Sequence, residues 1–291
     1  MKNKSRFDSP VLVKDIYQLK RFKGCYYLVG FSARMHARGF PFWEIVISDS
    51  SGTLSLYCLE QSCIFGELQP QSLVHVEGGL DQSGTAAYFR CKAIFPSENN
   101  NFTSRSVSQL PSKLCAYPES LNGLVKLIAS IKNESLRQFI NDVILSPSIA
   151  IPYITCPASL RYHHNYRSGL LVHSVEVANS TSNDNSLSDE QKDIAIVSAL
   201  LHDIGKTQTL TADLQRTAKG QLIDHDDLTL ELCGEALAKL DESHSYIANQ
   251  LRHAWTCKSP GARYGFKAKT KVAKRLIHCD RQSANLINAI N

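Results

Sequence analysis

The hydrophobic pattern of this chain changes once, near residue 112, and this change constrains the fold more than any other feature. Before it, apolar residues alternate with polar ones in short segments bounded by turn residues, which is the period of a β-strand. After it, apolar residues recur at spacings of three and four, which is the period of an amphipathic helix. We therefore expect a β domain followed by an all-α domain, an α+β multidomain chain.

Five segments of the N-terminal part have the alternation of strands. The expected strands are 26–36, 42–50, 52–59, 72–80 and 87–95. Between the third and the fourth, the stretch EQSCIFGEL offers a short helix. Five strands in so short a stretch favour a small closed barrel. The stretch EIVISDSSGTLSLYCL resembles the strand–turn–strand of an oligonucleotide-binding (OB) fold, in which the second strand ends in a D-x-x-G turn.

Barrels of the OB type bind single strands on one face, by stacking and by charge. The resemblance implies substrate contacts at Arg34, Arg38 and Trp43. Further candidates that mix rings with a cation are Phe31, Phe40, Tyr57, Phe89 and Arg90. The alternative for each ring is that it fills the barrel core. The formal net charge of +5 permits a polyanionic partner without requiring one.

A polar stretch separates the two patterns. Residues 97–112 read SENNNFTSRSVSQLPS, which has the composition of a linker. We expect an OB domain over 1–97, a linker over 98–112 and a helical domain over 113–291. The expected helices are 121–131, 136–145, 169–180, 189–205, 228–240, 244–255 and 271–289.

Histidines and aspartates recur at positions of the helical part where burial is expected. They are His173, His202, Asp203, His225, His253 and Asp280. Each alone has an ordinary explanation: a hydrogen-bonded core histidine, a solvated loop residue or half of a surface salt bridge. Together they predict a metal site, because a helical bundle points such groups inward and burying them unpaired costs several kcal/mol each. A divalent cation would satisfy all of them, as one or two ions.

The order H…HD…D is similar to that of the HD superfamily of metal-dependent phosphohydrolases, and HDIGK is the usual form of its central motif. The resemblance implies that His173, His202, Asp203 and Asp280 are metal ligands. It also implies that His225 and His253 are the extra ligands of the two-metal branch. By this resemblance Asp203 bridges the ions and orients the nucleophile, and Lys206 is a cation for phosphate oxygens.

The segment CPASLRYHHNYRSGLLVHSVEVA (156–178) resembles two groups within this superfamily. One is the YhaM-type 3′→5′ exoribonucleases, which place an OB domain before an HD domain, and the other is the HD region of MobH-class conjugative relaxases. The resemblance implies that His163 and His164 act in catalysis and that Asn165 and Arg167 contact substrate. The alternative is a loop of hydrogen-bonded polar residues.

The domain order favours the exonuclease-like group, as does the segment over 206–227, which resembles a short β-hairpin with His225 at its exit. Two departures stand against it. His253 is followed by Ala254 and Trp255, where the group usually has a second His and a Gly. Arg167 and Ser168 replace a more usual small residue or Gly. These changes concern the shape of the substrate pocket.

The expected function is therefore metal-dependent phosphodiester hydrolysis. We expect a 3′→5′ exonuclease that acts on single-stranded RNA, with single-stranded DNA as the alternative substrate. One alternative is a nucleotide phosphohydrolase with a regulatory barrel. Another is a nucleic-acid-binding protein related to the relaxases, with a metal-stabilised helical scaffold.

Manganese is the expected ion by resemblance, and the His/Asp donor set also suits iron or nickel, and magnesium less well. YhaM-type proteins imply a homo-oligomer. Nine scattered cysteines without a CxxC pair are expected to be reduced thiols. No apolar run approaches the length of a membrane span, and no signal peptide is evident, so we expect a cytoplasmic protein without a membrane partner.

Overall fold

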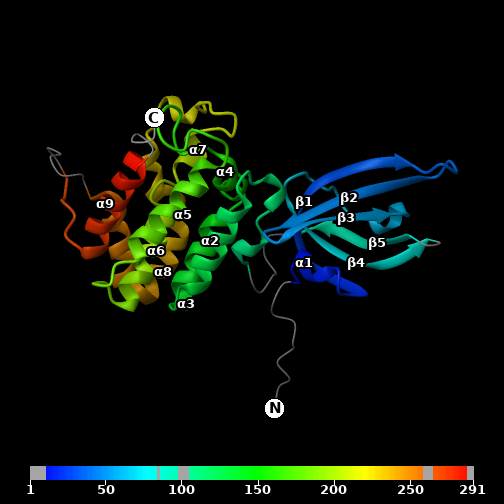
Figure 1. Cartoon of the computed structure of the whole chain (residues 1–291), viewed down its shortest axis with the longest axis horizontal. Coiled ribbons are helices and arrows are strands. Elements are labelled where there is room, and N and C mark those ends of the chain that lie inside the picture. The colour runs from blue at the N-terminus through cyan, green and yellow to red at the C-terminus, as the bar shows by residue number, and fades with distance from the viewer. Residues whose placement is uncertain (1–10, 84–85, 98–104, 258–264, 287–291) are drawn as a thin grey trace, which may run out of the picture. The chain divides into compact units, whose positions relative to one another are not determined.

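The structure is a computed structural model of the 291-residue chain, and it describes residues 11–83, 86–97, 105–257 and 265–286. It divides into two compact units, Met1–Leu114 and Cys115–Asn291 (Figure 1). No helix in the described ranges combines the length and apolarity that crossing a bilayer requires. All nine cysteines are free thiols.

The N-terminal unit is a closed five-stranded barrel. Its strands are β1 (Arg21–Met35), β2 (Pro41–Asp49), β3 (Gly52–Cys58), β4 (Leu73–Ser83) and β5 (Ala86–Pro96). Their order around the barrel is β1-β2-β3-β5-β4, closed by the antiparallel pairing of β1 with β4. The pairing of β3 with β5 is parallel. The expected barrel and its five strands are confirmed, and the expected short helix between β3 and β4 is a single 3-10 turn, η1 (Gln61–Cys63).

Alternating residues of the strands fill the barrel. The fully buried set includes Leu28, Ile45, Ile47, Leu56, Val74, Val76 and Ile94. The turn between β2 and β3 depends on Asp49, whose Oδ1 accepts hydrogen bonds from the backbone N–H groups of Ser51 and Gly52. Its Oδ2 accepts one from the backbone N–H of Val13, the first residue of α1 (Val13–Ile16). The D-x-x-G turn therefore also anchors the N-terminal helix on the barrel.

The expected linker needs correction where it is described. Residues 98–104 lie outside the described residues, but residues 105–114 contain two short turns, η2 (Val107–Gln109) and η3 (Ser112–Leu114). Val107 and Leu110 are buried, and the carbonyl of Ser108 accepts a hydrogen bond from the backbone N–H of Ser50 at 3.0 Å. Two apolar side chains within a polar run suffice to fold this segment onto the barrel, so it belongs to the N-terminal unit.

The C-terminal unit is all-α. Its helices are α2 (Pro118–Ser130), α3 (Glu134–Ile144), α4 (Ala150–Thr155), α5 (Gly169–Ser182), α6 (Asp189–Leu201), α7 (Lys206–Thr209), η4 (Lys219–Gln221), α8 (His225–Thr256) and α9 (Lys271–Leu286). Helices α5 and α6 pack against each other and both contact α9. Every residue of 193–201 is buried, so α6 runs through the core of this unit.

The two expected helices 228–240 and 244–255 agree with α8, which consists of two helices that meet at a kink with a non-helical backbone at His244. Two local expectations differ from the structure. The hairpin after α7 is reduced to one bridge, between Leu210 and Arg216. Backbone hydrogen bonds from Thr211 N–H to the Gln215 carbonyl and from Thr217 N–H to the Thr209 carbonyl flank this bridge. The Thr217 hydroxyl also donates to the carbonyl of Gln208. The short helix α4 is not among the helices that the periodicity predicts.

Helix α6 begins with a capping box, in which the Ser188 hydroxyl accepts from the backbone N–H of Gln191 and the Gln191 side chain accepts from that of Ser188. One turn later, the buried carboxylate of Asp193 accepts hydrogen bonds at 2.9 Å from the backbone N–H groups of Lys132 and Asn133. This carboxylate fixes α6 to the connection between α2 and α3.

Replacing Asp193 by Ala is expected to lower the free energy of unfolding by about 2–3 kcal/mol, because two buried backbone donors lose a charged acceptor. Urea denaturation followed by circular dichroism measures this. The control is Asp189→Ala on the same helix, which removes an exposed partner of Lys132 and is expected to have a much smaller effect. Equal midpoints for the two variants would contradict the role given to Asp193.

Candidate metal centre and adjoining pocket

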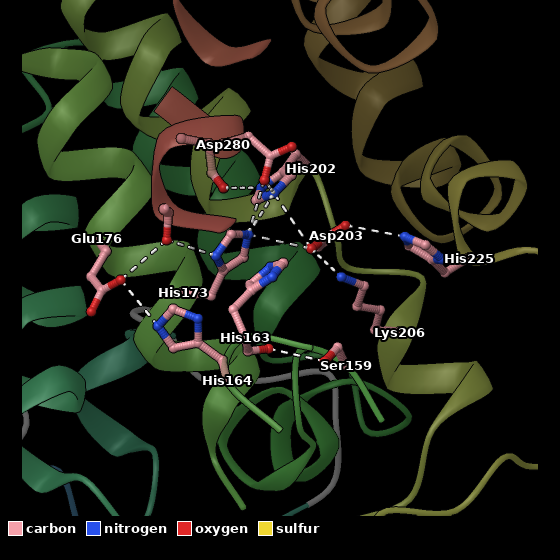
Figure 2. A network of polar contacts seen from close by, with 12 residues as sticks. Ser159, His163, His164, His173, Glu176, His202, Asp203, Lys206, His225 and Asp280 are labelled. Atoms are coloured by element: carbon pink, nitrogen blue, oxygen red, sulfur yellow. Dashed lines mark hydrogen bonds and ion pairs between the residues drawn. The ribbon is translucent and has the colours of Figure 1, made fainter. Parts of the chain in front are cut away.

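Four side chains from three helical segments meet inside the C-terminal unit (Figure 2). His173 lies on α5 and is completely buried. His202 is the residue that ends α6, Asp203 follows it, and Asp280 lies on α9. The packing of α5, α6 and α9 therefore brings together residues separated by more than a hundred positions in the sequence.

The donor atoms of these residues form a close group. His173 Nε2 lies 3.2 Å from His202 Nε2 and 3.2 Å from Asp280 Oδ1, and His202 Nε2 lies 3.5 Å from the same oxygen. Asp203 Oδ2 lies 3.6 Å and 3.4 Å from the two ring nitrogens. Ligands about 2.1 Å from one ion stand about 3.0–3.4 Å apart in ordinary geometries. The donor atoms of His173, His202 and Asp280 therefore fit the coordination sphere of a single divalent cation, and Asp203 Oδ2 lies beside the two rings.

Hydrogen bonds on the outer side of both rings fix which nitrogen faces inward. His202 Nδ1 lies 2.7 Å from the carbonyl of Ala199, which can only accept, so Nδ1 carries a proton. The Ser283 hydroxyl donates to Glu176 Oε2, so it accepts from His173 Nδ1 at 3.1 Å. Both Nε2 atoms thus direct lone pairs at each other and at two carboxylates. Such an arrangement requires a positive charge between them.

The pKa values of the residues in this group show the same need for positive charge. Burial opposes protonation of His202, but Asp203 and Asp280 outweigh it and raise the pKa of His202 to about 9. Burial also opposes ionisation of the two aspartates. Hydrogen bonds and nearby cations outweigh that effect and hold the pKa of both Asp203 and Asp280 below the ordinary value. Without a metal, a proton on His202 therefore supplies positive charge.

A second group adjoins the first through Asp203. Its Oδ1 lies 3.3 Å from His225 Nε2, which lies 3.3 Å from Asp226 Oδ1. His225 Nδ1 is held on its other side by Asp224 at 2.7 Å. Asp203 thus gives one oxygen to each group, and Lys206 Nζ lies 2.5 Å from its Oδ2. Asp226 is a donor that the sequence patterns did not single out, and the run of acids in DHDD at a helix start is the signal that was available.

The glycine of the HDIGK motif is needed for this arrangement. A Cβ atom placed on Gly205 would stand 2.0 Å from the carbonyl oxygen of His225. The backbone after Asp203 therefore lies directly against the start of α8, and this contact sets His225 beside Asp203. Any side chain at position 205 would push the two segments apart.

His163 and His164 are neighbours in one loop, but their side chains lie in different surroundings. His163 is half-buried, and burial, together with the neighbouring His173 and His164, lowers the pKa of His163 to about 4. It is therefore neutral at pH 7. His164 is buried with a left-handed backbone (φ +54°), and its Nε2 lies 3.0 Å from Glu176 Oε2. The expectation that His164 acts in catalysis stays a prediction: its Nε2 contacts Glu176, and it forms a group of possible metal donors with His163 and His173.

A hollow of about 600 Å³ opens next to Lys206. Its lining residues are Ala158, Ser159, Leu160, Arg161, Tyr162, His163, Lys206, Thr209, Leu210, Arg216 and His225. The expected substrate contacts Asn165 and Arg167 are exposed and do not belong to this lining. The hollow therefore gives a substrate access to the side of the centre formed by His163, Lys206 and His225.

Residues 170–282 match the family described as HD domain. This chain contains an HD domain. The match covers all four residues of the first group as well as His225 and Asp226. A 3′-5′ exoribonuclease YhaM from Bacillus licheniformis is 23% identical over 212 residues, which are 70% of this chain and 65% of that protein. The alignment thus spans slightly less than two thirds of the relative.

One solved structure, described as an aspartyl-tRNA synthetase from Leishmania major Friedlin, aligns with 14% identity and a TM-score of 0.26. The alignment covers 49% of this chain and 34% of that one. A likeness of this size carries no argument about the fold or the activity.

Within the HD domain, the expectation for His253 is corrected. Its Nε2 accepts a hydrogen bond from the backbone N–H of Lys269 at 2.9 Å, and it joins none of the converging groups among the described residues. His225 and His253 lie on the two parts of α8 before and after the kink at His244. Both parts contact the end of α6, since the Thr229 hydroxyl donates to the carbonyl of His202 and Trp255 Nε1 donates to the carbonyl of Ser198.

The structure also explains Ser168, which departs from the pattern of the YhaM-type group. Ser168 has a left-handed backbone (φ +66°), a conformation that favours glycine. Its hydroxyl is buried, donates to the carbonyl of Ile154 at 2.6 Å and accepts from the backbone N–H of Ala116 at 2.9 Å. These two bonds offset the backbone strain, so a serine is tolerated at the start of α5.

The expected contacts on the barrel divide into three kinds. Arg34 pairs with Glu44 at 2.9 Å on the strand pair β1–β2, and Arg38 is exposed in the turn between these strands. Trp43 is partly buried and packs against the barrel core, so its ring serves packing. Phe31 and Phe40 remain exposed, and Phe40 stacks on His36 with ring centroids 4.3 Å apart.

Replacing Glu176 by Ala is expected to weaken binding of Mn²⁺ by about 10–100-fold, because Ser283 then loses the acceptor that orients it toward His173. Competition with a fluorescent chelator measures the affinity. Glu242→Ala removes an exposed carboxylate of α8 and is the matched control, expected to bind as the original protein does. An unchanged affinity in the Glu176 variant, with normal circular dichroism, would show that the ring of His173 needs no such support.

Affinity for Mn²⁺ is also expected to rise with pH. Since the pKa of His202 is about 9 without metal, the ion must displace a proton at pH 7. The affinity should therefore increase about tenfold per pH unit from pH 7 toward 9 and level off above it. Calorimetry in buffers of different ionisation enthalpy should count about one proton released per ion at pH 7. A pH-independent affinity without proton release would contradict the charge state assigned to His202.

Proposed function

We propose that this chain is a metal-dependent phosphodiesterase that removes nucleotides from the 3′ end of single-stranded RNA. The observation that carries the proposal is the convergence of His173, His202, Asp203 and Asp280 beside a basic hollow. Divalent ions held there would lower the pKa of a water molecule and neutralise the charge that develops on a phosphate during hydrolysis. Two ions are proposed, with manganese as the first choice.

Residues at the edge of the centre have separate tasks in this proposal. Lys206 lines the hollow, so its ammonium group offers hydrogen bonds and charge to the non-bridging oxygens of the reacting phosphate. His163 presents a neutral imidazole to the same hollow and orients the ester through a hydrogen bond. His225 and Asp226 hold the second ion together with the Oδ1 atom of Asp203.

The choice of RNA rests on the relative, which is described as a 3′-5′ exoribonuclease, and on the barrel. Closed barrels of this type bind single strands through exposed rings and cations. Phe31 on β1 and Phe40 just before β2 supply exposed rings, and Arg38 in the turn between these strands supplies a cation. We propose that this face holds the strand while its end is cleaved in the HD domain.

The test uses 5′-labelled single-stranded RNA, single-stranded DNA and mononucleotides, each incubated with the full chain and Mn²⁺. Stepwise shortening of RNA from its 3′ end is the expected result. Asp203→Asn should lower the rate by about a thousandfold, since it weakens both ion sites and the metal contributes several kcal/mol to catalysis. Asp227→Asn, an exposed acid on α8, is the matched control and should keep the rate.

Two outcomes would overturn parts of this proposal. Turnover of mononucleotides alone would replace the exonuclease by a nucleotide phosphohydrolase. Normal hydrolysis by the Asp203 variant would place the chemistry elsewhere in the chain.

A further inference from the structure

We propose that the hollow beside the centre holds the phosphate that neighbours the scissile one along the strand, bound by Arg161 and Arg216, and that Tyr162 stacks on the adjoining base. The inference rests on the proposed function and deepens it, because it says why the substrate is a strand rather than a single phosphate ester. Both arginines lie in segments that the sequence analysis compares with known families, 156–178 and 206–227, but that analysis gives neither of them a role.

The charge of the hollow is the first observation. Arg161, Lys206 and Arg216 line it, and none of its lining residues carries a carboxylate. The acids of the centre lie on one side of it, where His225 and Lys206 contact Asp203 (Figure 2). A ligand entering the hollow therefore meets positive charge beyond the groups that hold the ions. This favours a second anionic group on the substrate.

The two guanidinium groups are free to take a ligand. Neither Arg161 nor Arg216 forms an ion pair in the described part of the chain, whereas other arginines do, such as Arg34 with Glu44 and Arg90 with Glu60. A guanidinium has five N–H donors in a planar fork that matches two oxygens of a phosphate. Unpaired arginines facing one hollow are thus the expected chemistry for an internal phosphodiester.

Arg216 is held in place before any ligand arrives. Its Nη1 donates to the carbonyl of Gly220 at 2.8 Å, which leaves the remaining donors of the fork available. Gly220 is itself in close contact with Thr209, since a Cβ atom at 220 would stand 2.1 Å from the Thr209 carbonyl oxygen. The bridge between Leu210 and Arg216 completes this fold-back. The segment therefore presents Arg216 from a packed support.

The opposite wall is also fixed by local hydrogen bonds. Ser159 Oγ accepts from the backbone N–H of Tyr162 at 2.9 Å and donates to the carbonyl of His163 at 3.0 Å. The Tyr162 side chain, with 73% of the residue exposed, stands at the rim of the hollow. An exposed ring on a fixed backbone is suited to stacking on a nucleic-acid base, which is sequence-tolerant.

The size of the hollow agrees with this occupant. A volume of about 600 Å³ suits a small-molecule ligand or one nucleotide unit. A mononucleotide that places its only phosphate at the ions would leave Arg161 and Arg216 without a partner. A strand with a second phosphate engages both parts of the site.

The experiment compares the dinucleotide ApA with its 5′-phosphorylated form pApA, which differ only in the second phosphate. The original protein is expected to prefer pApA by about tenfold or more in kcat/KM, since one good charged contact contributes about that much. In Arg161→Ala and Arg216→Ala this preference should fall toward one, because kcat/KM for pApA falls about tenfold more than kcat/KM for ApA. Tyr162→Ala should weaken both dinucleotides equally, because stacking does not depend on the added phosphate.

Lys219→Ala is the matched control, because it removes an exposed cation from the same segment that does not line the hollow. It should leave the preference unchanged. A preference for pApA that survives in both arginine variants would overturn the subsite, even with normal turnover.

A second measurement separates the subsite from the proposed activity. Calorimetric binding of pApA and ApA in the presence of EDTA involves no turnover, so it reports the subsite alone. A binding preference that Arg216→Ala abolishes would support the subsite even where neither dinucleotide is hydrolysed, and that absence of hydrolysis would overturn the proposed function. Equal binding of the two dinucleotides by the original protein would overturn the subsite.

Discussion

The helical unit packs around one electrostatic requirement, which is positive charge beside a group of His and Asp side chains. The Nε2 atoms of His173 and His202 lie 3.2 Å apart, and each lies 3.2–3.6 Å from a carboxylate oxygen of Asp203 and of Asp280 in a largely buried place. Burying such a group without positive charge would cost many kcal/mol, more than a domain of this size has to spare. Positive charge is therefore needed at this point, and hydrogen bonds from the Nδ1–H groups of the two rings to the Ala199 carbonyl and the Ser283 hydroxyl keep both Nε2 atoms directed inward.

The rest of the unit holds this group together. Tyr153 on α4 is completely buried and donates to the carbonyl of Leu200, two residues before His202. The buried carboxylate of Asp193 ties the same helix to the connection between α2 and α3. Position 205 admits no side chain, so the start of α8 lies against the HDIGK turn. These contacts act on the backbone, and through it they set distances between donor atoms.

The period of the hydrophobic pattern and the order of the His and Asp residues make much of this architecture predictable from the sequence. The alternation of the first hundred residues indicates five strands and a barrel, and the order of His173, His202, Asp203 and Asp280 indicates a shared centre. Long-range packing decides the rest. His253 has the residue type and order of a ligand, but its Nε2 accepts a hydrogen bond from the backbone N–H of Lys269. Val107 and Leu110 fold an apparent linker onto the barrel. Asp226 joins Asp203 and His225 in one group, and Glu176 contacts Ser283 and His164. Only the folded chain brings these residues together.

Asp203 turns its two oxygens to different groups, one shared with His173 and His202 and the other with His225 and Asp226. A single negative charge therefore serves two positions. A cation at one of them would draw on the same carboxylate as a cation at the other. In the proposed two-ion form, occupancy of the two positions would therefore be linked rather than independent.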